Sequence, residues 1–192
     1  MKNILNIAAG KLKPINLPDK YFLINLDTMY YDSIKPEHVE TIYSLFKEDK
    51  PQEHFCNESA FTFMERTKIV FDEVVSYRFL EHVEKDKVSY FIYLMSSCLK
   101  IGGEVDIIVP DYKLLAQMLL DEVPGENNWE ANDIIITTEM VNHPSDPHAS
   151  IWTKDRLKYF FELEGRFETI SNESYTYDGR DIYLRYKAKR IK

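Results

Sequence analysis

The alternation of hydrophobic and polar positions is most informative between residues 71 and 112. Residues 73–76 form a short, mostly apolar run behind an aspartate, which predicts a strand. Hydrophobic side chains then recur at helical spacing: Val88, Phe91, Ile92, Met95 and Leu99. Residues 105–109 predict a second strand, and Pro110 ends it because proline has no N–H to donate to a sheet. The pattern is that of a strand-helix-strand unit, which builds parallel sheets covered by helices.

Two glycines, Gly102 and Gly103, lie between the predicted helix and the second strand. Glycine adopts the left-handed conformation without a steric cost. The pair is therefore predicted to end the helix as its C-cap.

The same periodicities predict the remaining elements. Strands are predicted at residues 4–7, 21–26, 167–170, 173–177 and 181–186. Helices are predicted over residues 36–47, after a cap at Asn57, after a cap at Asp111, and from Thr153 to Gly165. Asp178-Gly179 between the last two strands indicates an antiparallel hairpin. With 192 residues, we expect one domain over residues 1–192 and an α/β fold.

Three short motifs of the central unit resemble those of a known family. Leu80-Glu81-His82, Lys100-Ile101-Gly102-Gly103 and Val109-Pro110-Asp111 are similar, in order and spacing, to the "LEH … LKPGG … VPD" signature of small class I S-adenosylmethionine-dependent methyltransferases. The resemblance implies a Rossmann-like three-layer sandwich, with a mostly parallel seven-stranded sheet that ends in an antiparallel hairpin. In that sheet, residues 73–76 are the fourth strand and residues 105–109 the fifth. The resemblance is weakest over residues 28–70.

The N-terminal region extends the resemblance to a cofactor site. The first strand runs into Ala8, Ala9 and Gly10, which are similar to the family's "LNLGCG" turn. Asp27 lies 17 residues after Gly10, near the place where a Rossmann-type site holds ribose hydroxyls. The resemblance therefore implies S-adenosylmethionine as the cofactor. Ala8 replaces the family's first glycine, and its methyl group either crowds the methionine part of the cofactor or is accommodated by the loop.

Further candidates follow from the rule that ligands of open α/β sheets lie at the carboxyl ends of the strands. By this rule Ser76 and Tyr77 are expected to bind the cofactor, and Arg78, Asp111 and Tyr112 the substrate. The resemblance implies that Glu81 and His82 also lie near the cofactor. For His82, a histidine held by local hydrogen bonds is the alternative. If the reaction uses a general base, His148 is the first candidate and His143 the second, and the alternative is two surface histidines in a loop.

The type of methyltransferase is narrowed by absent motifs. Residues 76–79 read Ser-Tyr-Arg-Phe, unlike the Asn/Asp-Pro-Pro-Tyr/Phe of DNA amino-methyltransferases, and no Pro-Cys pair is present. We expect an unidentified small-molecule, glycan or protein acceptor, and no metal, because the cysteines and histidines lack ligand spacing. The alternative is a methyltransferase-like fold that has lost turnover and serves as a binding or structural module. A nicotinamide-binding protein is disfavoured because the turn lacks the G-x-G-x-x-G pattern.

Charge and composition limit the partners. The net charge of −8 argues against a large nucleic-acid surface. Residues 180–192 hold six basic residues and one acid, which either contact phosphate or an acidic partner, or offset the acidic body. Cys56 and Cys98 are expected to be reduced thiols in the cytoplasm. No apolar run approaches the ~20 residues of a membrane span, and no signal peptide is evident. Because the first strand starts near Met1, we expect a cofactor edge that is open, or covered by residues 123–150, an oligomer or another partner.

Overall fold

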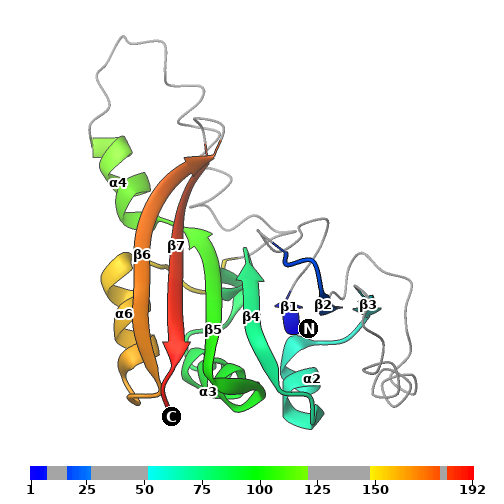
Figure 1. Ribbon diagram of the computed structural model, residues 1–192. Coiled ribbons are helices and arrows are strands. Elements are labelled where there is room, and N and C mark those ends of the chain that lie inside the picture. The colour runs from blue at the N-terminus through cyan, green and yellow to red at the C-terminus, as the bar shows by residue number, and fades with distance from the viewer. Residues whose placement is uncertain (8–16, 27–51, 121–147, 178–180) are drawn as a thin grey trace.

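The computed structural model describes residues 1–7, 17–26, 52–120, 148–177 and 181–192. Its strands form one seven-stranded sheet in the order β3-β2-β1-β4-β5-β7-β6 (Figure 1). The strands are β1 (Lys2–Ile7), β2 (Tyr21–Leu26), β3 (Gln52–Cys56), β4 (Phe71–Tyr77), β5 (Leu99–Pro110), β6 (Phe167–Tyr177) and β7 (Asp181–Arg190). The first five pair in parallel, and β7 runs antiparallel to both β5 and β6. The predicted mostly parallel sheet with a terminal antiparallel hairpin is confirmed.

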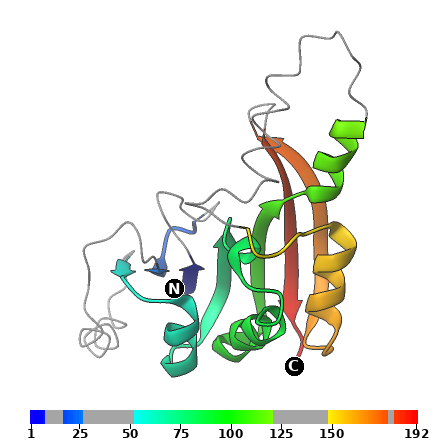
Figure 2. The ribbon, with the colours of Figure 1, turned by 180° about the vertical axis from the view of Figure 1, so that it is seen from behind.

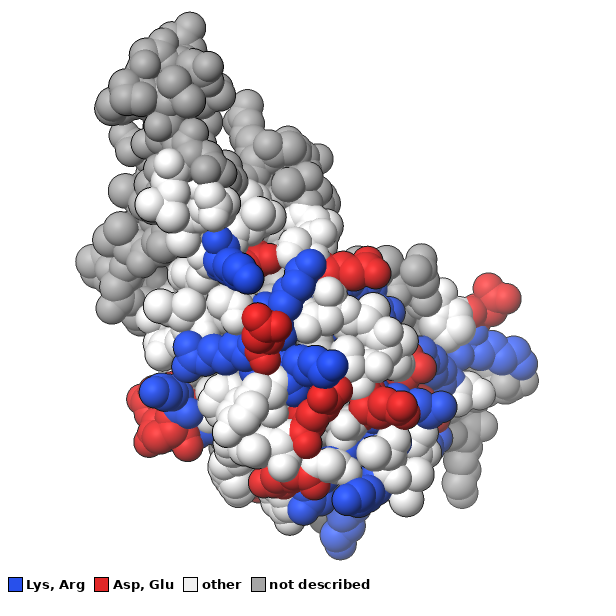
Figure 3. All heavy atoms as spheres, turned by 90° about the vertical axis from the view of Figure 1, so that its left-hand side faces the viewer, with Lys and Arg blue, Asp and Glu red and all other residues white. Residues whose placement is uncertain are grey.

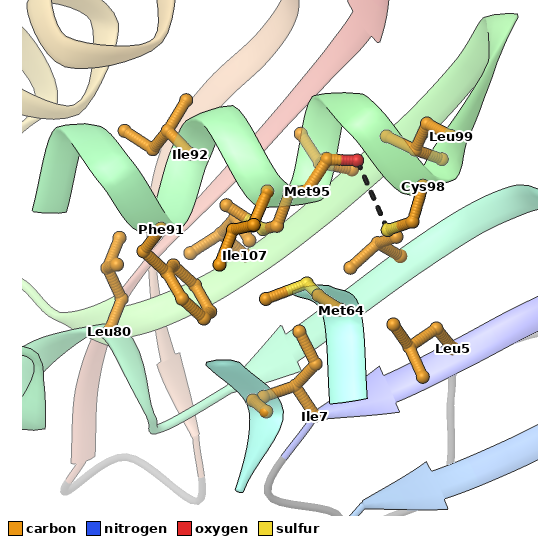
Figure 4. Packing of buried hydrophobic residues seen from close by; sticks show 14 of the residues in the cluster. Leu5, Ile7, Met64, Leu80, Phe91, Ile92, Met95, Cys98, Leu99 and Ile107 are labelled. Atoms are coloured by element: carbon orange, nitrogen blue, oxygen red, sulfur yellow. Dashed lines mark hydrogen bonds between the residues drawn. The ribbon is translucent and has the colours of Figure 1, made fainter. Parts of the chain in front are cut away.

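Three helices cover one face of this sheet. They are α2 (Ala60–Arg66), α3 (Val88–Cys98) and α6 (Lys154–Glu162), which lie in front of the strands in Figure 2. The side chains between them and the sheet form the main hydrophobic core. In Figure 4, Met64 of α2 and Phe91 of α3 extend toward Ile7 of β1. This packing fixes the carboxyl end of β1 beside the neighbouring strands.

The opposite face of the sheet has a smaller cluster of buried side chains. Successive strand residues point to opposite faces, so Ile4 and Val75 lie in this cluster although their neighbours Leu5 and Val74 lie in the main core. Tyr77 and three other residues, Leu23, Ile108 and Tyr183, complete it. The remaining elements are η2 (Leu80–His82), a single 3-10 turn after β4, and α4 (Tyr112–Leu120), which follows β5. In the described part of the chain, no helix is long and apolar enough to cross a membrane.

The two glycines after α3 have a different role from the one predicted. The helix ends at Cys98, and its C-cap Leu99 has an extended conformation (φ −90°, ψ 150°). Gly102 adopts the left-handed conformation (φ 84°) inside β5. At this point the pairing with β4 shifts register, because Phe71 pairs with Leu99 but Glu73 pairs with Glu104. The glycines therefore form an irregularity of the strand, and the helix ends without them.

Gly103 allows a close backbone approach in the same irregularity. A Cβ atom there would lie 2.9 Å from the carbonyl oxygen of Lys100 and 3.1 Å from that of Asp72. No side chain fits such a space without a backbone shift.

Some of the other sequence predictions are confirmed by the structure, and some are wrong. Strand β2 has the predicted bounds, and the Thr153 side chain caps α6 by accepting the Arg156 N–H at 3.3 Å. The N-cap of α2 is Ser59 and not Asn57. Residues 167–170 and 173–177 belong to one strand, β6, which is irregular between Thr169 and Ser171. The helix predicted over residues 36–47 lies outside the described residues.

Candidate active site

The candidate site lies where the parallel strands end. The order of the strands reverses between β1 and β4, since β2 and β3 extend the sheet from β1 while β5 extends it from β4. Ligands of open α/β sheets bind outside the carboxyl ends of the strands at such a switch point. The arrowheads of β4 and β5 point to this edge, at the top of Figure 1. The expected cofactor residues Ala8, Ala9, Gly10 and Asp27 lie outside the described residues, as does His143.

Ser76 places a hydroxyl group at this switch point. It pairs with Ile7, the last residue of β1, on one side and with Ile107 of β5 on the other. The side chain is fully buried, and its Oγ has no hydrogen-bond partner among the described residues. A buried polar group without a partner costs about 1–3 kcal/mol, so a buried hydroxyl at this position is suited to a ligand contact.

Arg78 turns the chain immediately after β4. It has a left-handed backbone conformation (φ 55°), and its N–H donates to the Ile108 carbonyl at 2.7 Å. Residues other than glycine adopt this conformation at a cost, and such positions cluster at functional sites. The Arg78 guanidinium lies over the Tyr183 ring, 5.7 Å from its centre. Arg78 thus lies at the predicted edge, and its side chain packs on β7.

Glu81, His82 and His148 come together on η2 and the segment before α6. Their potential ligand atoms all lie within 4.8 Å of one another, and the His82 and His148 ring centres are 4.9 Å apart. Glu81 is fully buried, whereas both histidines are half-buried. The spacing of the histidines in the sequence did not reveal this pair, because two segments distant in sequence meet here.

Backbone hydrogen bonds hold these two segments together. The N–H groups of Ala149 and Ser150 donate to the Glu81 carbonyl at 2.7 and 2.9 Å. The Ser150 hydroxyl, itself buried, donates to the Leu80 carbonyl at 3.0 Å. The position of His148 is therefore fixed relative to η2 by the residues that directly follow it.

Tyr112 fixes the ring of His148 from a third element. Its hydroxyl group is hydrogen-bonded to His148 Nδ1, and its ring meets the imidazole edge-on with centres 6.2 Å apart. The Tyr112 N–H donates to the Trp152 carbonyl at 3.2 Å, which joins α4 to the segment after His148. The contact of Tyr112 with substrate stays a prediction, and its hydrogen bond to His148 orients that ring.

Asp111 has local partners for both carboxylate oxygens. Its Oδ1 accepts the Leu114 N–H at 3.2 Å, as expected for the cap of α4, and its Oδ2 accepts the Ser174 hydroxyl of β6. The residue is 3% exposed. Asp111 is therefore buried because it caps α4 and bonds to Ser174. Its contact with substrate stays a prediction.

A charged cluster on β5 and β7 was missed by the sequence interpretation. Asp106 is buried and accepts two hydrogen bonds from Arg185, at 2.8 and 2.5 Å, and Lys187 lies 3.4 Å away. The hydrogen bond to Asp106 raises the pKa of Arg185 above its usual value. The Tyr77 hydroxyl, expected at the cofactor, donates to the same carboxylate at 3.2 Å. Alternate residues of a strand point to the same face, so Arg185 and Lys187 share one face of β7. This alternation is the one sequence signal that could have indicated the cluster.

These contacts also assign part of the basic run at residues 180–192. Arg185 and Lys187 contact Asp106, and Arg190 donates to the Leu99 carbonyl. On the face seen in Figure 3, basic and acidic side chains lie interspersed. Part of the local positive charge is therefore neutralised within the sheet.

A second polar network crosses β1, β2 and β3. The Asn6 amide donates to the Asn25 side-chain oxygen at 2.8 Å, and the Asn25 amide donates to Glu53 at 3.0 Å. Both asparagines are 1% exposed. The hydrogen bonds compensate for the burial of these amides and hold the three strands in register.

Comparisons with known proteins support the fold. No protein-family model and no curated protein matches the sequence. Among solved structures, 1,6-didemethyltoxoflavin-N1-methyltransferase from Burkholderia thailandensis, with bound 1,6-didemethyltoxoflavin and S-adenosylhomocysteine, has a TM-score of 0.59 and 12% identity over 100% of this chain and 72% of its own.

Two further solved structures have the same architecture. The N-methyltransferase NodS from Bradyrhizobium japonicum, in complex with S-adenosylhomocysteine, has a TM-score of 0.56 and 14% identity over 100% of this chain and 79% of its own. A SAM-dependent methyltransferase from Methanosarcina mazei has a TM-score of 0.57 and 18% identity over 99% and 92% of the two chains. The chain therefore has the Rossmann-like fold of the S-adenosylmethionine-dependent methyltransferases.

Proposed function

We propose that the protein is an S-adenosylmethionine-dependent methyltransferase that acts on a small-molecule, glycan or protein acceptor. The observation that carries the proposal is the set of polar side chains at the carboxyl end of β4. Ser76, Glu81 and His82 follow one another along this strand end and the turn after it, and His148 joins them from the segment before α6. The fold and the bound S-adenosylhomocysteine of its structural neighbours agree with this assignment.

Ser76 supports a cofactor at this edge. Its buried hydroxyl group lies beside the end of β1 and has no partner among the described residues. We assign the cofactor contacts to Ser76, to residues 8–10 and to Asp27, with Glu81 and His82 nearby. When bound, S-adenosylmethionine supplies a methyl group on a sulfonium, and transfer to oxygen or nitrogen is an in-line displacement that depends on the alignment of the two reactants.

The histidine cluster is assigned to the acceptor. In the absence of a metal, His148 takes the proton that the acceptor's hydroxyl or amino group loses as its lone pair bonds to the methyl carbon. Tyr112 holds Nδ1 of that ring, which leaves Nε2 for the proton. The Glu81 carboxylate lies beside the ring and stabilises the resulting imidazolium. Arg78 lies at the same edge and is assigned to acceptor binding.

A binding experiment tests the proposal. S-adenosylhomocysteine should raise the melting temperature of the purified protein, and NAD should not, because a ligand that binds only the native state stabilises it. Asp27→Ala should weaken S-adenosylhomocysteine binding at least ~10-fold, since hydrogen bonds to a charged acceptor contribute roughly 1.5–3 kcal/mol each. Asp19→Ala is the matched control, because the exposed Asp19 precedes β2 at its opposite end. Folded protein that shows no shift with millimolar S-adenosylhomocysteine would contradict the proposal.

Ala8 motivates the alternative of a binding or structural module without turnover. If the alanine pushes the cofactor away, Ala8→Gly should tighten S-adenosylmethionine binding more than tenfold. If the loop has adapted to alanine, affinity should stay equal or fall slightly, because glycine costs about 0.5–1 kcal/mol in unfolded-state entropy. Measurable wild-type binding without a gain in the variant supports the enzyme, and a large gain supports the module.

A further inference from the structure

We infer that Glu81, His82 and His148 form a binding site for a divalent transition-metal ion. Two imidazoles and one carboxylate are the ligand set of many zinc sites that keep an open coordination position. The same set, two histidines and one carboxylate, also binds other first-row metals. Nothing in the spacing of the sequence indicates this site, because His148 lies far along the chain from the Glu81-His82 pair.

The distances between the side chains are close to those of a metal site. The three ligand atoms lie within 4.8 Å of one another. Around a tetrahedral ion with bonds of about 2.1 Å, the ligand atoms are about 3.4 Å apart. Side-chain rotations that bring the atoms up to about 1.4 Å closer would complete the site.

The backbone already holds the ligands in place. Glu81 and His82 are adjacent on the single turn η2, and the Glu81 carbonyl accepts the N–H groups of Ala149 and Ser150, the residues that follow His148. The entropy of bringing the two segments together is therefore lost in folding, not in ion binding. A site on such a scaffold binds an ion more tightly than three side chains on mobile loops.

Tyr112 provides the second contact that metal-binding histidines require. Such histidines almost always use their other ring nitrogen in a hydrogen bond, which fixes the tautomer and the ring orientation. The Tyr112 hydroxyl bonds to Nδ1 of His148, so Nε2 is the nitrogen that can bind an ion. This contact is independent of the ligand cluster and points to the same use of the ring.

Burial and charge agree with a cation. The Glu81 side chain is fully buried, and a buried carboxylate is stable only with a compensating positive charge or a proton. Both histidines are half-buried, so the cluster is reachable from solvent on their side. An ion held here would keep coordination positions for water or an acceptor.

The ligand atoms select the class of ion. Mg²⁺ and Ca²⁺ prefer oxygen ligands, whereas imidazole suits Zn²⁺, Co²⁺ and Fe²⁺. We therefore assign the site to a transition-metal ion of this class, with Zn²⁺ or Co²⁺ as the probe.

The consequence for the acceptor rests on the proposed function. An ion at the end of β4 would bind an acceptor hydroxyl directly and lower the pKa of that hydroxyl. The hydroxyl proton would pass to solvent, and His148 would serve as a ligand and not as the base. The acceptor class is then an oxygen nucleophile, especially one with a second oxygen nearby that can bind the same ion.

Titration of the tag-free, chelator-treated protein with Co²⁺ tests the site. We expect one ion per chain, the visible absorption bands of low-coordinate Co²⁺, displacement by Zn²⁺, and no competition from Mg²⁺ at equal concentration. Glu81→Gln and His148→Ala should each weaken the affinity at least tenfold. Glu81→Gln keeps the shape of the buried side chain, so its folded state can be checked by circular dichroism.

Two matched variants serve as controls. Glu84→Gln changes an exposed carboxylate near the site that pairs with Lys87, and His54→Gln changes a histidine on β3 that packs on Phe22. Both should keep the wild-type affinity. Absence of Co²⁺ binding at millimolar concentration, or equal affinity in all four variants, would overturn the inference.

Separate measurements distinguish this inference from the proposed function. S-adenosylhomocysteine binding without Co²⁺ binding would leave the methyltransferase proposal standing and refute the metal site. Co²⁺ binding without S-adenosylhomocysteine binding would support the metal site and refute the methyltransferase proposal.

Discussion

The hydroxyl group of Tyr112, the first residue of α4, is hydrogen-bonded to Nδ1 of His148, which lies in the segment before α6. This bond ties the end of β5 to the histidine cluster on η2. It connects three parts of the chain that are separate in sequence and sets which nitrogen of His148 faces a ligand. Loss of the hydroxyl should therefore affect the cluster more than the cofactor edge.

Tyr112→Phe tests this separation of roles. The variant keeps the ring packing and loses the hydrogen bond, so we expect Co²⁺ affinity to fall about tenfold, as for other residues that orient metal-binding histidines. S-adenosylhomocysteine affinity should stay unchanged. Tyr90→Phe is the control, because the Tyr90 hydroxyl bonds to Glu65 on the surface. Equal Co²⁺ titrations for both variants would show that Tyr112 does not orient the ligand.

The left-handed conformation of Arg78 predicts that the Arg78→Gly variant is more stable than the Arg78→Ala variant. Alanine at φ 55° keeps the left-handed strain of about 1–2 kcal/mol, whereas glycine removes it. Both variants lose the contact with the Tyr183 ring equally. Arg78→Gly should therefore unfold in urea with a free energy about 1 kcal/mol higher than Arg78→Ala. At ordinary strand or helix positions alanine is the more stable of the two, so the usual order here would argue against a strained turn.

Asp106→Ala should be one of the most destabilising single changes in the sheet. It removes the buried carboxylate and leaves Arg185 and Lys187 without their partner, and loss of one member of a buried ion pair costs about 3–5 kcal/mol. Arg185 is partly exposed, so we expect a loss of about 2–3 kcal/mol of unfolding free energy, measured in urea. Glu164→Ala breaks an exposed pair with Arg166 and should change stability by less than about 1 kcal/mol. Similar losses in the two variants would show that the Asp106 cluster is not a structural tie.

The burial of Cys98 predicts a lower free energy of unfolding at alkaline pH. Burial raises the pKa of this thiol from 9.0 to about 12, and its Sγ lies 3.4 Å from the Met95 carbonyl oxygen (Figure 4). Between these values the unfolded chain releases the thiol proton and the native chain keeps it. The unfolding free energy should therefore fall as pH rises from about 9 toward 12, by up to about 1.4 kcal/mol per pH unit.

The control for this pH dependence is Cys98→Ala, in which all other groups titrate as before. Urea unfolding at several pH values should give a shallower decline in this variant. Burial also raises the pKa of Cys56, to about 11, so part of the decline should remain. Parallel curves for wild type and variant would mean that Cys98 does not titrate differently on unfolding.

The elements that could be predicted from the sequence are those with a strong local pattern of apolar residues. Strand β2 and the order strand-helix-strand from β4 to β5 form as expected, because both have strong apolar periodicity and packed neighbours. The bounds of the second strand were wrong, since β5 begins at Leu99, which was predicted on the helix. Gly102 was misassigned because a left-handed glycine suits both a helix cap and a strand irregularity. Only pairing with β4 decides between these, and pairing is a long-range property. Strand β3 was missed because residues 52–56 include charged and polar side chains and show no alternation.

The candidate site was predictable in outline and not in its contacts. Strand order placed Ser76 and Glu81 at the functional edge, as the rule for open α/β sheets requires. The contact between His82 and His148 depends on backbone hydrogen bonds from residues 149 and 150 to Glu81, which no residue preference encodes. Asp106 was predicted only as part of a strand, and its ion pair was missed because its partner Arg185 lies on a strand much later in the chain.

The position of β7 between β5 and β6 constrains the order in which the sheet can be completed. During synthesis β6 emerges before β7, yet β6 joins the sheet only through β7, so it cannot be incorporated until the later strand is available. The parallel strands and their helices can assemble first, and the edge of β5 then has no paired strand until β7 is made. An unpaired strand edge of this kind is prone to pair with other chains. Until β7 has been made, the edge of β5 is therefore exposed to pairing with another chain.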